Sequence, residues 1–421
     1  MHFLPKNYII IPFGSARGTR AASPGGKIRI MIYLLLAVIY LTFISLGLPD
    51  SVFGAVWPVA QLDFGVSGSL GSLYTTLTGA AGALAGFFAG RLINKFGTYA
   101  VTAVSVALTA VGLLLISFTT AFWQMLAISV VMGLGSGAID TGLNTFVSEH
   151  YGATHMNLLH CFWGVGVMLS PIIMSVFIGK GDWQKGYIVL ASIQFAIFAV
   201  VAASFPMWKK FASDSTAEIK KKVKRKVKEI LRSKGVLLSI FSLGLYCAAE
   251  FTVGTWGASY LVNARHIPED KAALGSTAFY GGLMLGRLIA GILAIKLSDK
   301  ALIRAGLVVA IPGVVLLAIP AGIWGAYLAL AVIGVGMGPI FPSVLHTVPA
   351  RFGTDSAAEI TGYHMGGAYI VGFAVQLSFG FLAGKVGYEF MAYLLLVIVA
   401  LTIFVTELVA YKMKKVSENV E

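Results

Sequence analysis

Twelve long apolar runs limit how this chain can fold. Each has about 20 residues or more, the length that an α-helix needs to cross a hydrocarbon core of about 30 Å. Because that core offers no water, each run must be a helix that satisfies its own backbone hydrogen bonds. The runs cover residues 30–57, 68–91, 98–118, 121–148, 157–178, 186–208, 236–263, 272–296, 301–319, 323–347, 358–384 and 387–411. The sequence therefore predicts an all-α membrane protein with twelve transmembrane helices.

The two halves of the chain repeat one pattern about 200 residues apart. Asp50 recurs as Glu250, and Gly54 recurs as Gly254. Further matches pair Gly82 with Gly282, Gly86 with Gly286, Gly133 with Gly334 and Gly137 with Gly338. Glycines at such spacing let helix backbones approach closely in lipid. Duplicated membrane units of this kind hold a substrate between the copies. We expect two pseudo-symmetric six-helix bundles with a site between them.

The distribution of Lys and Arg gives the orientation. Of the 31 basic residues, 25 fall on the side that holds both termini, and cytoplasmic loops carry such an excess. We therefore expect a multi-pass protein of a prokaryotic cell (plasma) membrane with both termini cytoplasmic. The expected parts are a cytoplasmic and disordered tail at 1–29, a bundle at 30–208, a basic linker at 209–235, a bundle at 236–411 and a cytoplasmic tail at 412–421.

The basic run at 220–228 has two readings. Such runs bind nucleic acid, and they also bind the anionic surface of a membrane when they lie next to a span. Nothing aromatic is interleaved to stack bases. We therefore expect membrane lipids, and no nucleic acid, as partners.

Signatures of catalysis are missing from the sequence. It has no Gly-rich phosphate loop ending in Lys-Ser/Thr, no metal-spaced Cys/His cluster and no G-x-S-x-G on a strand-to-helix turn. We expect neither an enzyme nor a cofactor or bound metal. Uphill transport would then need an ion gradient, and a proton moved through 100 mV supplies about 2.3 kcal/mol.

Carboxyl groups within the apolar runs are the sharpest functional signal. Each costs about 3 kcal/mol at a helix centre, so it needs a partner, water or a function. Asp50 follows Pro49 in the first run, Asp140 lies in the fourth and Glu250 in the seventh. A carboxyl group withdrawn from water can take up a proton near neutral pH. We interpret the three acids as proton-coupling residues, although each could instead be a packing acid that caps a neighbouring helix.

Polar and aromatic side chains of the same runs are candidates for substrate contact. A ring that faces a cavity can stack on the apolar face of a sugar, whereas Trp and Tyr at helix ends usually mark the membrane interface. The candidate substrate-binding residues are Asn144, His160, Trp163, Tyr246, Trp256, Tyr280 and His364. Arg287, in the eighth run, could hold an anionic substrate or make a structural bond to a carboxylate.

The segment between the second and third runs reads Gly90-Arg-Leu-Ile-Asn94-Lys95-Phe-Gly97. It resembles the cytoplasmic loop motif of the major facilitator superfamily, with Asn94 in the place of an aspartate. The resemblance implies a twelve-helix fold that works by alternating access. We expect a conformational (gating) role for Gly90, Asn94, Lys95, Gly97 and, in the eighth run, Arg287.

Finer motifs resemble the fucose–galactose–glucose proton symporter branch of that superfamily. The fourth run reads Gly137-Ala-Ile-Asp140-Thr-Gly-Leu-Asn144, and the seventh reads Tyr246-Cys-Ala-Ala-Glu250. In the branch, an acid of the first span and one of the fourth handle protons and sugar hydroxyls, which implies these roles for Asp50 and Asp140. Polar residues of the fifth span contact sugar, which implies a similar role for His160 and Trp163.

The expected function is secondary active transport, with uptake of a hexose-type sugar coupled to protons. The partners would be a small-molecule substrate, protons or sodium, and membrane lipids, and we expect a monomer. One alternative in the same fold is a proton-coupled efflux antiporter for a drug or metabolite. Another is a sensor or scaffold without transport, which two costly intramembrane acids in one half argue against. The sequence leaves the particular sugar open.

Overall fold

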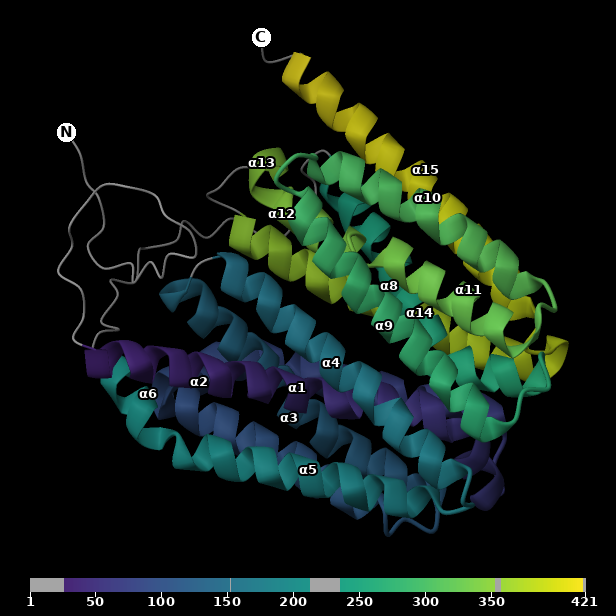
Figure 1. Ribbon diagram of the computed structural model, residues 1–421. Helices are drawn as coiled ribbons and strands as arrows, with labels where there is room; N and C mark the ends of the chain where they lie inside the picture. The colour runs from purple at the N-terminus through teal and green to yellow at the C-terminus, as the bar shows by residue number, and fades with distance from the viewer. Residues whose placement is uncertain (1–25, 152, 213–234, 353–356, 419–421) are drawn as a thin grey trace.

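The computed structural model describes residues 26–151, 153–212, 235–352 and 357–418. Within these ranges the secondary structure is helical, and the helices form two bundles side by side (Figure 1). Most of the tail expected at 1–29 and of the linker expected at 209–235 lies outside the described residues, as do the last residues of the tail at 412–421.

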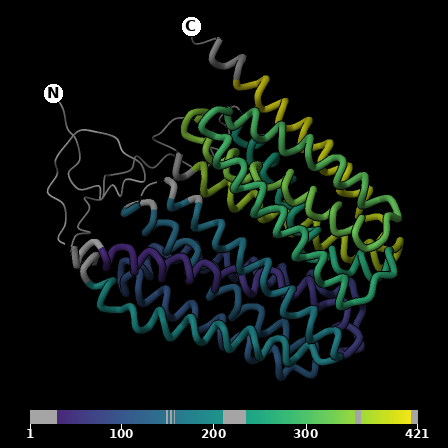
Figure 2. Tube along the Cα trace, in the orientation of Figure 1, coloured from purple at the N-terminus to yellow at the C-terminus, as the bar shows by residue number. Residues whose placement is uncertain are grey.

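The first bundle follows the first half of the chain, in purple to teal in the trace of Figure 2. Its helices are α1 (Gly26–Asp63), α2 (Gly71–Ile116), α3 (Phe122–His150), α4 (Ala153–Ile178), α5 (Trp183–Ala203) and α6 (Phe205–Ala212), with a short 3-10 helix at Gly68–Leu70.

The second bundle continues from residue 235 and runs from green to yellow in the trace (Figure 2). Its helices are α8 (Val236–Asn263), α9 (Glu269–Leu293), α10 (Asp299–Ala318), α11 (Gly322–Met337), α12 (Ile340–His346), α13 (Val348–Phe352), α14 (Ala357–Val386) and α15 (Phe390–Glu418).

Eleven stretches of the described residues are long and apolar enough to cross a membrane. One of them, Gly68–Ile116, has 49 residues and covers the expected run 68–91 and nearly all of the expected run 98–118. The two are separated at Gly97, whose φ of 82° and ψ of 155° lie outside the helical region. Eleven stretches therefore account for the twelve expected runs, because one stretch holds two runs. The fold is that of an all-α membrane protein.

The ends of two expected runs were wrong. The first helix does not stop near residue 57 but continues through Pro58 to Asp63. Neighbouring helices in a membrane bundle tolerate the backbone groups that a proline frees. The sixth run, expected at 186–208, is divided at Ser204 between α5 and α6.

Equivalent helices pack in the same way in both bundles. In the first bundle α1 packs on α4 and α2 on α3, and in the second α8 packs on α14 and α9 on α11. Glycines make these contacts close: a Cβ at Gly137 would overlap the carbonyl of Gly82, and a Cβ at Gly286 would overlap the carbonyl of Val335. The repeated glycines of the sequence therefore mark helix–helix contacts.

The bundles meet near one end of the molecule. We call this the far end, where α1 and α8 finish, and the opposite end, where α1 and α8 begin, the linker end. Three hydrogen bonds join the bundles in the half nearest the far end, from Ser175 to the carbonyl of Asp270, from Thr277 to that of Met168 and from Gln376 to the hydroxyl of Thr75. The ribbons diverge toward the linker end (Figure 1).

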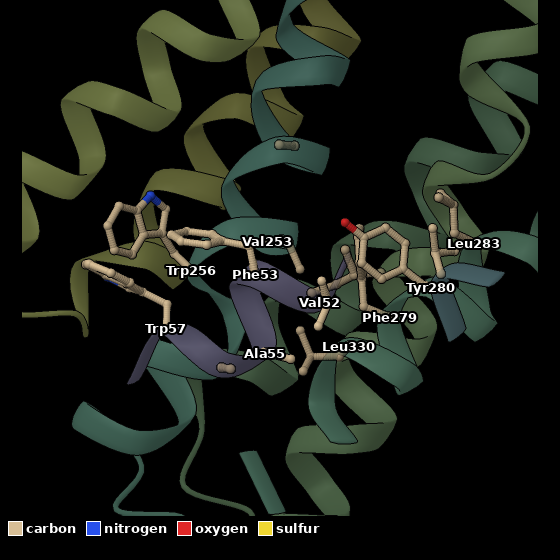
Figure 3. Packing of buried hydrophobic residues seen from close by; sticks show 14 of the residues in the cluster. Val52, Phe53, Ala55, Trp57, Val253, Trp256, Phe279, Tyr280, Leu283 and Leu330 are labelled. Carbon is tan, nitrogen blue, oxygen red and sulfur yellow. The ribbon is translucent and has the colours of Figure 1, made fainter. Parts of the chain in front are cut away.

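The contact between α1 and α8 is a close one between the bundles. A Cβ at Gly54 would overlap the carbonyl of Gly254, its counterpart in the repeat. Figure 3 shows Phe53 and Trp57 of α1 packed near Val253 and Trp256 of α8 at this interface. The two bundles are therefore held together partly by a buried, aromatic contact on the far side of the centre.

Candidate functional site

A carboxylate of α1 and an indole of α4 form the first half's side of the central interface. Asp50 is exposed, although the residues that follow it in α1 are buried as far as Pro58. The indole nitrogen of Trp163 donates a hydrogen bond of 2.8 Å to Oδ2 of Asp50. Gly47 of α1 lies against the backbone of Trp163, which lets the two helices approach this closely.

The same indole meets the second bundle. The guanidinium carbon of Arg287 lies 5.0 Å from the ring centroid of Trp163, within the range of a cation–π interaction. The ring of Tyr280 lies edge-on to it, with centroids 6.3 Å apart and an angle of 86° between the planes. Trp163 therefore touches both an acid of its own bundle and a cation of the other.

Arg287 also faces an acid of its own bundle. Its Nη2 lies 3.9 Å from Oε1 of Glu250, and both side chains are largely buried, with 14% and 12% of their surfaces exposed. The Nε of Arg287 and the hydroxyl of Tyr246 are buried without a hydrogen-bond partner. Buried polar groups are usually paired, so the Nε–H can donate to a ligand, and the hydroxyl can donate to or accept from one, at small cost.

Asp140 and Asn144 form a second polar pair one helical turn apart on α3. The Nδ2 of Asn144 donates to Oδ1 of Asp140 at 2.8 Å and to the Asp140 carbonyl at 2.9 Å. The Oδ1 of Asn144 is buried and has no partner. The pair therefore offers an unpaired acceptor beside a carboxylate.

The three acids surround one central region. The charge of Asp50 interacts with those of Asp140 and Glu250, and the hydroxyl of Tyr369 on α14 interacts with all three. Carboxyl groups that share a site in this way influence one another's protonation. The structure therefore brings together acids from α1, α3 and α8. We call these three acids, with Trp163 and Arg287, the central group.

Of the two histidine candidates, His160 lies near this group and His364 lies apart from it. His160 is half-buried, lies edge-on to Phe43 with centroids 6.0 Å apart, and interacts electrostatically with Arg287. His364 is fully buried near the linker end, where its ring nitrogens contact the carbonyl of Ile360 and the hydroxyl of Ser239. His160 thus lies beside the central group, whereas His364 holds α14 to α8.

Trp256 is also placed outside the central group. It is fully buried toward the far end and donates a 3.1 Å hydrogen bond to the carbonyl of Gln376. Its ring packs against Phe379 and Tyr388. In this conformation it joins α8 to α14 rather than facing the acids.

The gating candidates of the first half lie around the break at Gly97 in the middle of α2. Asn94 and Lys95 are exposed, and the open space around Gly90 would admit a side chain. Gly97 adopts a positive φ that glycine accepts readily. These residues lie away from the central group, whereas Arg287 lies inside it.

Sequence reasoning missed Tyr369. It lies in the expected eleventh helix, where a tyrosine also occurs at 363, and only the fold shows which of the two faces the acids. The ring also lines an apolar cavity of about 360 Å³ between α2 and α14, together with Thr76, Gly79, Ala80 and Phe373. The central group therefore adjoins an apolar space.

The linker end contains a buried histidine outside the membrane spans. The Nδ1 of His155 lies 2.7 Å from the hydroxyl of Tyr40. Burial lowers the pKa of His155 below its ordinary value. The contact ties α4 to α1 where the bundles diverge.

Comparisons with known proteins agree with the fold. The model of the family described as Major Facilitator Superfamily matches residues 39–376. The crystal structure of the nucleoside transporter NupG superposes with a TM-score of 0.71 at 14% identity, covering 90% of this chain and 99% of that one. This structural likeness concerns the fold alone.

Three curated relatives are similar at low identity. Bypass of stop codon protein 6 of Saccharomyces cerevisiae is 22% identical over 62% of this chain and 57% of its own length. The cis,cis-muconate transport protein of Acinetobacter baylyi is 24% identical over 77% and 81%. The glucose/mannose transporter GlcP of Bacillus subtilis is 20% identical over 50% and 55%. The chain thus spans little more than half the length of two of these relatives.

Proposed function

Since the chain belongs to the Major Facilitator Superfamily, we propose that it takes up a hexose-type sugar together with protons by alternating access. The family and the transporter relatives identify a membrane transporter and not an enzyme. The family and the apolar helices also identify a multi-pass membrane protein.

The observation that carries the proposal is the group of three acids between the bundles. Asp50, Asp140 and Glu250 lie on three different helices around one region. In the proposed mechanism Asp50 and Asp140 take up and release the coupled protons. Glu250 acts on the site through its electrostatic contact with Arg287. Because protonation removes a charge at the place where the bundles meet, it changes how strongly the bundles attract one another there.

The sugar would bind where unpaired polar atoms remain. Its hydroxyls can donate to the Oδ1 of Asn144 and can donate to or accept from the hydroxyl of Tyr246. His160 adds a further polar group, and the rings of Trp163 and Tyr280 offer apolar faces. Glucose and mannose are the substrates in the printed name of one relative, which supports a sugar of this size.

The conformation fits one half of an alternating cycle. We place the linker end in the cytoplasm, and the protein in the cell membrane, because 25 of the 31 basic residues lie on that side. The bundles contact one another toward the far end and diverge toward the linker end. On this reading the structure is open toward the cytoplasm, the state that releases an imported solute.

Uptake can be tested in proteoliposomes. With the lumen alkaline, the purified protein should accumulate radiolabelled glucose or mannose above equilibrium, and a protonophore should abolish the accumulation. A sodium gradient at equal pH on both sides tests the alternative coupling ion. Absence of accumulation for every hexose under both gradients would contradict the proposal.

The apolar cavity beside Tyr369 favours one second candidate, a proton-coupled efflux antiporter for an apolar drug or metabolite. Ligand sites for such solutes are mostly apolar with a few polar groups. The direction of solute flux against the proton gradient separates the two functions.

A further inference from the structure

Arg287 is a buried cation with incomplete pairing. Its side chain is 14% exposed, and its Nε has no hydrogen-bond partner. The 3.9 Å between its Nη2 and Oε1 of Glu250 exceeds hydrogen-bond length. A buried donor without an acceptor is unfavourable, so the Nε–H of Arg287 can donate to an acceptor of a solute.

The position of Arg287 against Trp163 decides what kind of acceptor fits. The guanidinium lies over the indole at 5.0 Å from its centroid. A cation–π contact engages no hydrogen-bond donor, so the N–H groups on the edge of the planar guanidinium stay available. Such an edge matches the two oxygens of a carboxylate, which it binds through two parallel hydrogen bonds.

Each bundle contributes one candidate partner for a solute's hydroxyl groups. The hydroxyl of Tyr246 is buried and unpaired one helical turn before Glu250, and Oδ1 of Asn144 is buried and unpaired beside Asp140. A carboxylate alone would leave these two atoms unsatisfied. A solute with a carboxylate and several hydroxyls can satisfy all of them.

We propose that the central site binds a sugar acid, with the carboxylate on Arg287 and hydroxyls toward Tyr246 and Asn144. The proposal rests on the proposed transport function, whose sugar class it narrows from an unmodified hexose to an anionic derivative. Glu250 is then the internal competitor that occupies Arg287 when no solute is bound.

The charges in the site balance when one proton enters with the anion. The solute's carboxylate takes the place of that of Glu250 beside Arg287, and one proton that enters with the anion leaves the net charge of the site unchanged. The titratable groups that face this pair are Asp50 from α1, His160 and Cys161 from α4, Tyr246 and Cys247 from α8, Tyr280 from α9 and Tyr369 from α14.

Binding of D-glucuronate and of D-glucose to the purified full-length protein tests the proposal. Wild-type protein should bind glucuronate at least about 10-fold more tightly than glucose, because charge-assisted hydrogen bonds are roughly twice as strong as neutral ones. Arg287→Gln should weaken glucuronate binding about 10- to 100-fold and change glucose binding little. Arg304→Gln, which removes an arginine that pairs with Glu407 outside the site, should change neither.

A second variant covers the case in which Arg287→Gln does not fold. Glu250→Gln keeps the shape of the competitor and removes its charge, so glucuronate should bind about 10-fold more tightly than in the wild type. Unchanged or weaker glucuronate binding in Glu250→Gln would overturn the proposal, and so would equal glucuronate affinity in wild type and a folded Arg287→Gln.

The outcomes separate this proposal from the transport function itself. If glucose binds at least as tightly as glucuronate and is accumulated, transport stands and the carboxylate subsite is wrong. If neither ligand binds or is transported, the proposed sugar transport fails, and the subsite fails with it.

Discussion

Trp163 donates its indole N–H to Oδ2 of Asp50 at 2.8 Å, and the opposite bundle's Arg287 lies on the face of the same ring. One side chain thus links the acid of α1 to the cation of α9. Loss of the Asp50 charge on protonation weakens the hydrogen bond, because bonds to charged acceptors are stronger than bonds to neutral ones. This frees the indole at the place where the bundles meet.

The first prediction separates the two contacts of this indole. Trp163→Phe keeps an aromatic face for Arg287 but removes the donor to Asp50. Solute exchange without a gradient should stay within about threefold of wild type, while proton-driven accumulation should fall about 10-fold or more, since a hydrogen bond to a charged group contributes about 1.5–3 kcal/mol. Trp163→Leu, which loses both contacts, should impair exchange as well. Wild-type accumulation by Trp163→Phe would contradict the linkage.

The second prediction concerns Asp140. Asp140→Asn keeps a hydrogen-bonding side chain beside Asn144 but cannot release a proton. Proton-driven accumulation should therefore be lost while solute binding remains measurable. Uptake in proteoliposomes at pH 6 and pH 7.5, with binding measured in parallel, checks this. Undiminished uphill uptake at both pH values would remove Asp140 from the coupling mechanism.

The third prediction uses the repeated glycines. Gly133→Val and Gly334→Val place side chains against the carbonyls of Thr78 and Phe279 at equivalent helix contacts. Each should destabilise the protein by about 1–3 kcal/mol, the usual effect of overpacking. Gly362→Val, where an added Cβ meets open space, is the matched control. Melting temperatures in detergent compare the three, and a loss of stability confined to one half would count against equivalent packing.

The fourth prediction is a pH dependence of stability. Burial lowers the pKa of His155, so the folded protein disfavours its charged ring. The stability it contributes is fully present above its ordinary pKa of about 6.5 and is lost as pH falls toward the folded pKa. Between pH 7.5 and pH 5 the melting temperature of wild type should fall further than that of His155→Gln. Equal falls in both proteins would show that another group is responsible.

The sequence was sufficient for the fold because spans and glycines act locally. An apolar run must be helical in lipid whatever surrounds it, and glycines such as Gly82 and Gly282 predicted close helix contacts that the structure contains. The end of α1 was wrong because proline in a soluble helix and proline in a membrane bundle have different consequences. The continuation of α1 beyond Pro58 depends on neighbouring helices, which no local sequence pattern identifies.

The site was harder to predict, because its members come from different helices. The acids stood out by their cost in lipid, but the rotation of each helix decides which aromatic ring meets them. Trp163 and Trp256 look alike in sequence, both lying within apolar spans, yet one bonds Asp50 and the other is packed between α8 and α14. Tyr369 had no local signal that separated it from other tyrosines of the chain.

The contact of Gly54 with Gly254 joins two positions that correspond in the repeat. A residue that meets its own counterpart lies on the pseudo-two-fold axis, as it would in an isologous homodimer of one six-helix unit. In such a homodimer a single mutation would alter both sides of the contact at once. In the fused chain the two positions mutate separately, and they already differ: a Cβ at Gly54 would meet the carbonyl of Gly254, whereas a Cβ at Gly254 would meet the hydroxyl of Tyr280. Fusion thereby allows the pivot between the bundles to become asymmetric.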